Sequence, residues 1–131
     1  MNPNTLNSSN RPAPNSTTSN PPVSRITGKP IDCSNPQDQQ EMNYCAVQSY
    51  EKADRELQAM YQQMHDQMPE ASQPQLEKAQ QEWVEFRSAE CRLEAKAHEG
   101  GSLYPTVLYR CMTRMTRDRM TQLQEQVQPQ G

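Results

Sequence analysis

The stretch ECRLEAKAHEGGSLYPTVLYRC, residues 90–111, decides the fold because it places one cysteine on each side of a pair of glycines. Gly100-Gly101 follows a helical apolar pattern, and glycine commonly closes a helix. A further helical segment begins near Tyr104. Counting equal steps back from this turn places Cys91 level with about residue 110, within one turn of Cys111. The stretch therefore predicts a helical hairpin whose two arms a disulfide can join.

The chain has four cysteines, an even number, and all of them lie inside the part that can fold. If Cys91 pairs with Cys111, the remaining pair is Cys33 with Cys45, which needs the residues before the first helix to fold back along it. Pairing of Cys45 with Cys91 is the main rival. A metal site is the competing use of four cysteines, but no Cys-x-x-Cys pair is present. We predict two disulfides formed in an oxidising compartment, with no metal and no cofactor.

Two long amphipathic helices precede the glycine pair. Asn35 is a candidate N-cap with Pro36 at the first helical position, and apolar residues then recur at three-four spacing from Met42 to Met68. A second helix begins at Ser72 as a candidate N-cap. Its stripe, which puts Trp83 and Phe86 in the core, consists of Leu76, Ala79, Trp83, Phe86, Glu90, Leu93 and Ala97.

The third helix, from about residue 103, shows a weaker pattern. Its stripe consists of Val107 or Leu108, Cys111, Met115, Arg119 and Leu123. Met112 and Met120 either mark an exposed surface for pairing or fill the core. Short connections favour antiparallel neighbours, so residues 32–127 predict an all-α, three-helix antiparallel bundle with two disulfides.

The ends of the chain differ from this folded part. Residues 1–31 contain no Asp or Glu and are dominated by Asn, Pro, Ser and Thr, so they cannot bury enough apolar surface to offset the entropy lost on ordering. We predict a disordered tether over residues 1–31 and a disordered tail over 128–131. Met1 to Asn4 do not start a signal peptide, and no stretch could span a membrane. If the cysteines pair, we expect an export signal or anchor that was removed or that precedes this chain.

The sequence offers little for catalysis. His65, on the expected exposed side of the first helix, and His98, beside the glycine turn, are the candidate bases, but no serine or free cysteine is placed for activation. No glycine-rich phosphate loop is present. The carboxylates of the second helix recur on its polar side and indicate a solvated face. We predict that the chain is not an enzyme and has no catalytic residue.

Charge divides the folded part in two. Residues 32–99 hold 14 acidic against six basic side chains, a net charge of −8, and residues 100–131 hold two against four, a net charge of +2. Arg110, Arg114 and Arg117 either face the acidic helices or point to water. A net negative domain without interleaved aromatic residues is a poor candidate for binding nucleic acid. An acidic surface suits a cationic protein partner, which long-range attraction would bring in faster.

Many residues of the folded part match a known pattern. They are Glu41-Met42-Asn43-Tyr44-Cys45-Ala46, Tyr50, Ala53-Asp54, Leu57 and Tyr61, then Leu76, Ala79-Gln80, Trp83, Phe86-Arg87 and Cys91, then Gly100-Gly101-Ser102, Cys111, Thr116, Arg119 and Leu123. In this order and spacing the chain resembles the LprI-like lysozyme-inhibitor domain family. The family pattern usually has Asp after the Phe-Arg pair, where this chain has Ser88. The resemblance implies an exported bacterial helical domain, periplasmic, envelope-anchored or secreted, and a named member of the family inhibits lysozyme.

Four matched residues are polar although they lie near the expected core: Asn43, Asp54, Gln80 and Arg87. Buried polar groups are usually hydrogen-bonded to one another, so an internal network is the first interpretation. A role in binding a partner is the alternative.

The resemblance leads to the hypothesis that the chain binds a cationic hydrolase of the lysozyme type and blocks its cleft. Loops project from a scaffold and can enter a concave site. The candidate loop is His98, Glu99, Gly100, Gly101, Ser102, Leu103 and Tyr104. The alternative for the loop is that it only reverses the chain. The alternatives for the protein are an envelope interaction or immunity module without a lysozyme target, and a cytosolic helical protein with free thiols.

Overall fold

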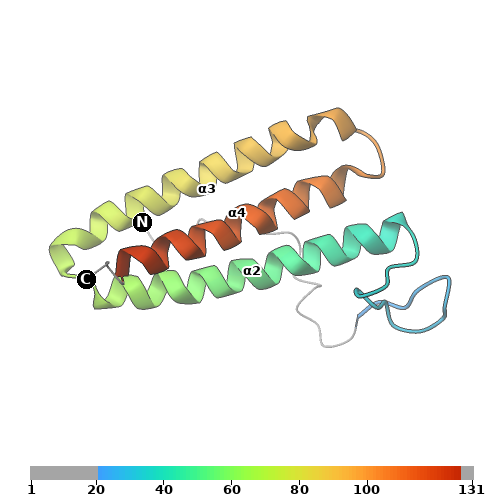
Figure 1. Cartoon of the computed structure of the whole chain (residues 1–131), viewed down its shortest axis with the longest axis horizontal. Coiled ribbons are helices and arrows are strands. Elements are labelled where there is room, and N and C mark those ends of the chain that lie inside the picture. The colour runs from blue at the N-terminus through green and yellow to red at the C-terminus, as the bar shows by residue number, and fades with distance from the viewer. Residues whose placement is uncertain (1–20, 128–131) are drawn as a thin grey trace.

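Three long helices form the protein, and the computed structural model describes them within residues 21–127. They are α2 (Gln39–Gln67), α3 (Gln73–Ala95) and α4 (Tyr104–Val127). Short 3-10 turns, η2 (Glu70–Ser72) and η3 (Lys96–His98), lie in the two connections. Figure 1 shows the helices side by side, with α3 antiparallel to α2 and α4. The predicted three-helix antiparallel bundle is confirmed.

Helix α4 holds the bundle together. It lies between α2 and α3 in Figure 1 and makes close backbone contacts with both of them. None of the helices within the described range is long and apolar enough to cross a membrane.

Both predicted disulfides are present. Cys33 is bonded to Cys45, with a Cα–Cα distance of 5.5 Å, and this bond ties the segment before α2 to the second turn of that helix. Cys91 of α3 is bonded to Cys111 of α4, also at a Cα–Cα distance of 5.5 Å, as equal counting from the glycine turn predicts. The rival pairing of Cys45 with Cys91 is therefore wrong.

The start of α2 differs from the prediction. Its N-cap is Asp38, whose side chain accepts a hydrogen bond from the backbone N–H of Glu41 at 2.9 Å, so the prediction of Asn35 and Pro36 was wrong by three residues. Asp32 explains the delay, because its carboxylate accepts hydrogen bonds from the backbone N–H and the hydroxyl of Ser34. This local turn competes with the helix. The same hydrogen bonds lower the pKa of Asp32 below its usual value.

The core has two apolar clusters. One joins the far end of α2 to α3 and α4 and consists of Leu57, Tyr61, Met64, Leu76 and Leu123. The other surrounds the buried disulfide and consists of Tyr50, Cys91, Cys111 and Met112. Met112 is buried, and Met120 packs against the first cluster, so both methionines fill the core, and the alternative of an exposed pairing surface on α4 is wrong.

The buried face of α3 is shifted by about one residue from the predicted apolar stripe. Its buried residues are Leu76, Gln80, Val84, Arg87, Cys91 and Ala95. Phe86 is 57% exposed and Leu93 is 68% exposed, so their placement in the core was wrong. Trp83 is half-buried and packs against the first cluster. The cause is that Cys91, held by its disulfide, fixes the inner face, and two polar residues occupy core positions that an apolar pattern does not reveal.

Part of the predicted tether is ordered. Residues 22–31 form a turn in which Ile31 N–H donates to the carbonyl oxygen of Pro22 at 2.9 Å and Ser24 N–H donates to that of Lys29 at 2.7 Å. The Ser24 hydroxyl, which is buried, donates to the Glu41 carboxylate on α2. A disordered spacer over these residues is therefore not what the structure shows. Residues 1–20 of the tether and the predicted tail at 128–131 lie outside the described residues.

Candidate functional site

A buried ion pair links the three helices at the centre of the bundle. Arg87 of α3 is fully buried, and its Nη1 lies 3.7 Å from Oδ1 of Asp54 on α2. The same Nη1 donates a hydrogen bond to the hydroxyl of Thr116 on α4 at 3.1 Å. The guanidinium lies 4.9 Å from the ring centroid of Trp83 and 5.3 Å from that of Tyr50. Although Ser88 replaces the usual acidic neighbour, Arg87 finds its carboxylate on another helix.

A second polar contact lies beside the first. The Nε of Arg119 donates to the side-chain oxygen of Gln80 at 3.0 Å, and both residues are buried. The guanidinium carbon of Arg119 lies 5.8 Å from the centroid of Trp83, so two arginines lie near the same indole ring. Burial lowers the pKa of Arg119. These contacts support the internal-network interpretation of Asp54, Gln80 and Arg87, and the buried groups are out of reach of a partner.

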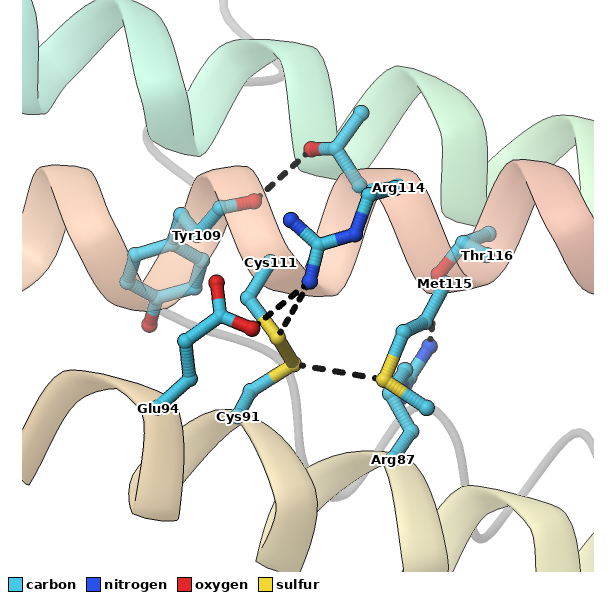
Figure 2. The surroundings of a disulfide bond; sticks show 9 residues. Arg87, Cys91, Glu94, Tyr109, Cys111, Arg114, Met115 and Thr116 are labelled. Atoms are coloured by element: carbon cyan, nitrogen blue, oxygen red, sulfur yellow. Dashed lines mark hydrogen bonds and ion pairs between the residues drawn. A yellow bond between two sulfur atoms is a disulfide. The ribbon is translucent and has the colours of Figure 1, made fainter.

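The surface around the buried disulfide is closed by a further ion pair. Figure 2 shows Arg114 of α4 reaching across the disulfide to Glu94 of α3, with Nη2 2.8 Å from the Glu94 carboxylate. The same nitrogen lies 3.5 Å from Sγ of Cys111. On the other side, the sulfur of Met115 lies 3.6 Å from Sγ of Cys91. The disulfide is therefore covered on both sides, and its two cysteines are fully buried.

Residues 99–103 of the candidate loop form the connection between η3 and α4, while His98 is the last residue of η3 and Tyr104 is the first residue of α4. Glu99, Gly100, Gly101 and Ser102 are exposed, while the flanking residues are half-buried. Gly101 N–H donates to the His98 carbonyl oxygen at 3.0 Å. Gly100 has φ +82°, a conformation that favours glycine. The tip of the loop is therefore narrow and carries no large side chain.

Asn43 of α2 braces this loop. Its side-chain N–H donates to the carbonyl oxygen of Ser102 at 2.9 Å. Its side-chain oxygen accepts hydrogen bonds from Gln39 and from the hydroxyl of Thr106. Asn43 is the fourth predicted polar residue, and its network holds the loop against the bundle rather than filling the centre. The hydrogen bond to Ser102 joins the loop directly to α2.

The two histidines lie near the connections between the helices. Nε2 of His65 lies 2.7 Å from the Glu77 carboxylate of α3, and the side chain of His65 is only 18% exposed, so its placement on the exposed side of α2 was wrong. The contact ties the last turn of α2 to the first turns of α3. His98 is half-buried at the start of the candidate loop. In the stretch from residue 21 to residue 127 no group of three or more His, Cys, Asp or Glu side chains could hold a metal ion.

Tyr61 gives a testable pH dependence. Burial, with a smaller contribution from the Glu77 carboxylate, raises its pKa to about 12. An unfolded tyrosine ionises near pH 10, so the stability contributed by neutral, folded Tyr61 is complete below about pH 10 and is lost as the pH rises toward about 12. We expect the urea midpoint of the wild type to fall over this window more than that of Tyr61→Phe, measured by circular dichroism. Identical pH profiles for the two proteins would contradict this environment for Tyr61.

The sequence interpretation missed one surface, the outer face of α3. Phe86 and Leu93, the two most exposed large apolar residues of the helices, lie seven residues apart on this face. Glu82 and Glu90 lie one helical turn before and after Phe86 and share its side of the helix. The signal was available in principle, because a core position at Cys91 turns residues 86 and 93 outward. We call Phe86, Leu93, Glu82 and Glu90 the α3 outer face.

Comparison with known proteins gives two matches. A family model described as "Lysozyme inhibitor LprI" matches residues 33–123, a range that contains all four cysteines and the candidate loop. An uncharacterized protein of Rhizobium meliloti (strain 1021) is 30% identical over 107 residues, which cover 72% of this chain and 77% of that protein. No solved structure gives a significant match.

Proposed function

Because the chain belongs to the LprI family of lysozyme inhibitors, we propose that it binds a lysozyme-type cell-wall hydrolase and blocks the active-site cleft of that enzyme with the loop of residues 98–104. Membership of the family supports a lysozyme-inhibitor role in general, and it is consistent with the prediction that the chain is not an enzyme. Lysozyme-type enzymes cleave a sugar bond between two carboxylates, so an inhibitor needs only to exclude the substrate and water.

The braced loop is the observation that carries this proposal. Its tip is exposed, narrow and free of large side chains, and Asn43 fixes it to α2. A binding segment that already has its bound conformation loses little entropy on association. The loop also lies at one end of a stiff bundle, where a concave site can receive it without contact along the whole bundle.

The α3 outer face supports the same docking. Helix α3 leads directly through η3 into the loop, so a partner that extends from the loop along the outer side of α3 would reach this face. Exposed apolar side chains grouped on one face mark interaction sites more often than isolated ones do. The carboxylates of Glu82 and Glu90 beside Phe86 suit a cationic partner. We propose that Phe86 and Leu93 pack against the rim of the cleft.

The proposed site of action is the bacterial envelope or the space outside it. Two disulfides and the inhibitor family are compatible with a location outside the cytoplasm. An enzyme that degrades the cell wall acts outside the cytoplasm, so its inhibitor meets it in that location. We therefore propose that the chain is exported and works in the periplasm, on the envelope or after secretion.

A pair of charge reversals tests the role of the loop. Glu99 and Glu70 are both exposed glutamates, and they lie in the connections at opposite ends of the bundle. We expect Glu99→Arg to raise the concentration needed for half inhibition of a purified lysozyme at least ~10-fold, because it brings like charges together at the interface. Glu70→Arg changes the net charge equally and should shift this concentration by less than ~2-fold.

The outcomes of this test separate the alternatives. Equal losses in the two variants would show that only net charge matters and would overturn docking through the loop. If the wild type neither inhibits nor binds lysozyme, the interaction or immunity alternative replaces the inhibitor proposal. Circular dichroism and a thermal melt of each variant control for changes in the fold.

A further inference from the structure

A groove lies on the surface along the seam between α2 and α4, and none of its lining residues belongs to the candidate loop. It has a volume of about 470 Å³, within the usual range of binding sites. One wall is α4, which contributes the arginines 110, 114 and 117 together with Asp118. This wall carries more positive than negative charge in a domain whose first two helices are acidic.

The three arginines of this wall differ in their ion pairs within the bundle. Arg114 is paired with Glu94 of α3, as internal charge complementarity predicts. Arg110 and Arg117 are exposed, and neither has an ion-pair partner among residues 21–127. Two guanidinium groups thus remain available at the groove although carboxylates outnumber cationic side chains in the chain. A guanidinium group pairs best with a carboxylate or phosphate, through two parallel hydrogen bonds.

The opposite wall of the groove has different chemistry. It consists of Pro36, Met42, Ala46 and Ser49 with the disulfide of Cys33 and Cys45. This wall is largely apolar, and the disulfide fixes its position relative to α2. The groove is therefore preformed, with a basic wall facing an apolar wall.

We propose that this groove binds an extended acidic segment of a partner protein, with acidic side chains on Arg110 and Arg117 and apolar side chains against Met42 and Ala46. An extended chain points successive side chains to opposite sides, so alternating acidic and apolar residues match the two walls. A phosphate polymer or a free phosphate would satisfy the arginines and leave the apolar wall unused.

The dimensions favour a short extended segment. Arg110 and Arg117 are seven residues apart on α4, which corresponds to about 10.5 Å along the helix. Side chains on the same side of an extended chain recur every two residues, about 6.8 Å, so acidic residues two or four positions apart bracket this distance, and the flexible arginine side chains make up the difference. No lining residue belongs to the loop of residues 98–104, so this inference does not depend on the proposed inhibition of lysozyme.

Binding of a synthetic peptide tests the proposal. The probe is a six-residue peptide in which glutamate and valine alternate, titrated into the full disulfide-bonded protein at low salt and followed by calorimetry and amide NMR shifts. We expect saturable binding, with shifts at Ala46 and Thr113, two residues of the groove lining. The double variant Arg110→Gln/Arg117→Gln should weaken binding at least ~10-fold.

A matched variant and a second ligand complete the test. Arg55→Gln/Arg92→Gln removes two exposed arginines outside the groove and should change the affinity by less than ~2-fold. Tripolyphosphate should bind more weakly than the peptide. The proposal is overturned if the wild type shows no saturable binding, if both double variants lose affinity equally, or if tripolyphosphate binds as tightly as the peptide.

Discussion

Replacing Arg87 with alanine is expected to lower the free energy of unfolding by about 3–5 kcal/mol, the usual loss when one partner of a buried ion pair is removed. Arg87 is fully buried, and its guanidinium contacts Asp54 at 3.7 Å and Thr116 at 3.1 Å. The truncation would leave the Asp54 carboxylate in the interior without its arginine. It would also remove the packing of the guanidinium on Trp83 and Tyr50.

Urea denaturation of the disulfide-bonded protein measures this effect. Arg92→Ala is the matched control, because Arg92 is an exposed arginine on the same helix and its loss should stay within about 0.5 kcal/mol. The double variant Arg87→Met/Asp54→Leu should recover most of the loss, since an apolar pair of similar size avoids the buried charge. A loss below about 1 kcal/mol for Arg87→Ala would mean that water reaches this site and that the pair is not buried in solution.

Removal of the disulfide between α3 and α4 is expected to have the second large effect. The double variant Cys91→Ser/Cys111→Ser should lose about 3 kcal/mol from the greater entropy of the unfolded chain alone, given a separation of 20 residues. Both positions are fully buried, so the two serine hydroxyl groups add a cost of burial. The helical hairpin would then depend on packing and on the pair of Arg114 with Glu94.

The other disulfide provides the comparison. Cys33→Ser/Cys45→Ser should lose less, because Cys33 is exposed and the segment before α2 can fray without opening the core. Urea midpoints of the two double variants under the same conditions measure the difference. Equal losses, or a larger loss for the pair near the N-terminus, would contradict the central role of the bond between Cys91 and Cys111.

Features set by helix geometry could be predicted from the sequence. The distance of Cys91 and Cys111 from Gly100-Gly101 gives their pairing, because the rise per residue is the same in both helices. The same glycines locate the loop, and the positive φ of Gly100 explains why glycine is required there. These predictions succeed since they depend on backbone geometry and not on which side chains are buried.

The register of α3 could not be predicted from hydropathy. Gln80 and Arg87 occupy core positions, whereas Phe86 and Leu93 are exposed, which reverses the usual preferences of these residue types. An apolar stripe therefore appears one residue away from the true inner face. A buried arginine becomes favourable only through its partners on two other helices, and a single helical sequence does not contain that information.

The N-terminal segment was misjudged for a related reason. Asn35 and Pro36 have the composition of a helix start, but Asp32 holds the chain in a turn and Asp38 caps α2 instead. The turn at residues 22–31 is anchored to α2 by hydrogen bonds from Ser24 to Glu41 and from Arg25 to Gln40, contacts across 17 and 15 positions of the sequence. The composition of a segment predicts how readily it becomes ordered by itself, but it does not predict hydrogen bonds to residues far away in the sequence.

The candidate surfaces could be predicted only in part. The loop is marked by its glycines and the arginines of α4 by their spacing, but their surroundings depend on the fold. Only the structure shows that Asn43 braces the loop and that Arg110 and Arg117 face an apolar wall built by a disulfide. The kind of partner that each surface can bind depends more on these neighbouring groups than on the glycines or arginines alone.

Inhibition of a purified lysozyme by the disulfide-bonded chain is the most direct test of the central claim. Lysozyme is titrated with the protein at low salt, and lysis of bacterial cell walls is followed by turbidity. The proposed cleft blocking predicts that activity falls with added protein and reaches its minimum near an equimolar ratio. Full lysozyme activity in the presence of an excess of folded protein, with no complex detected by gel filtration, would contradict it.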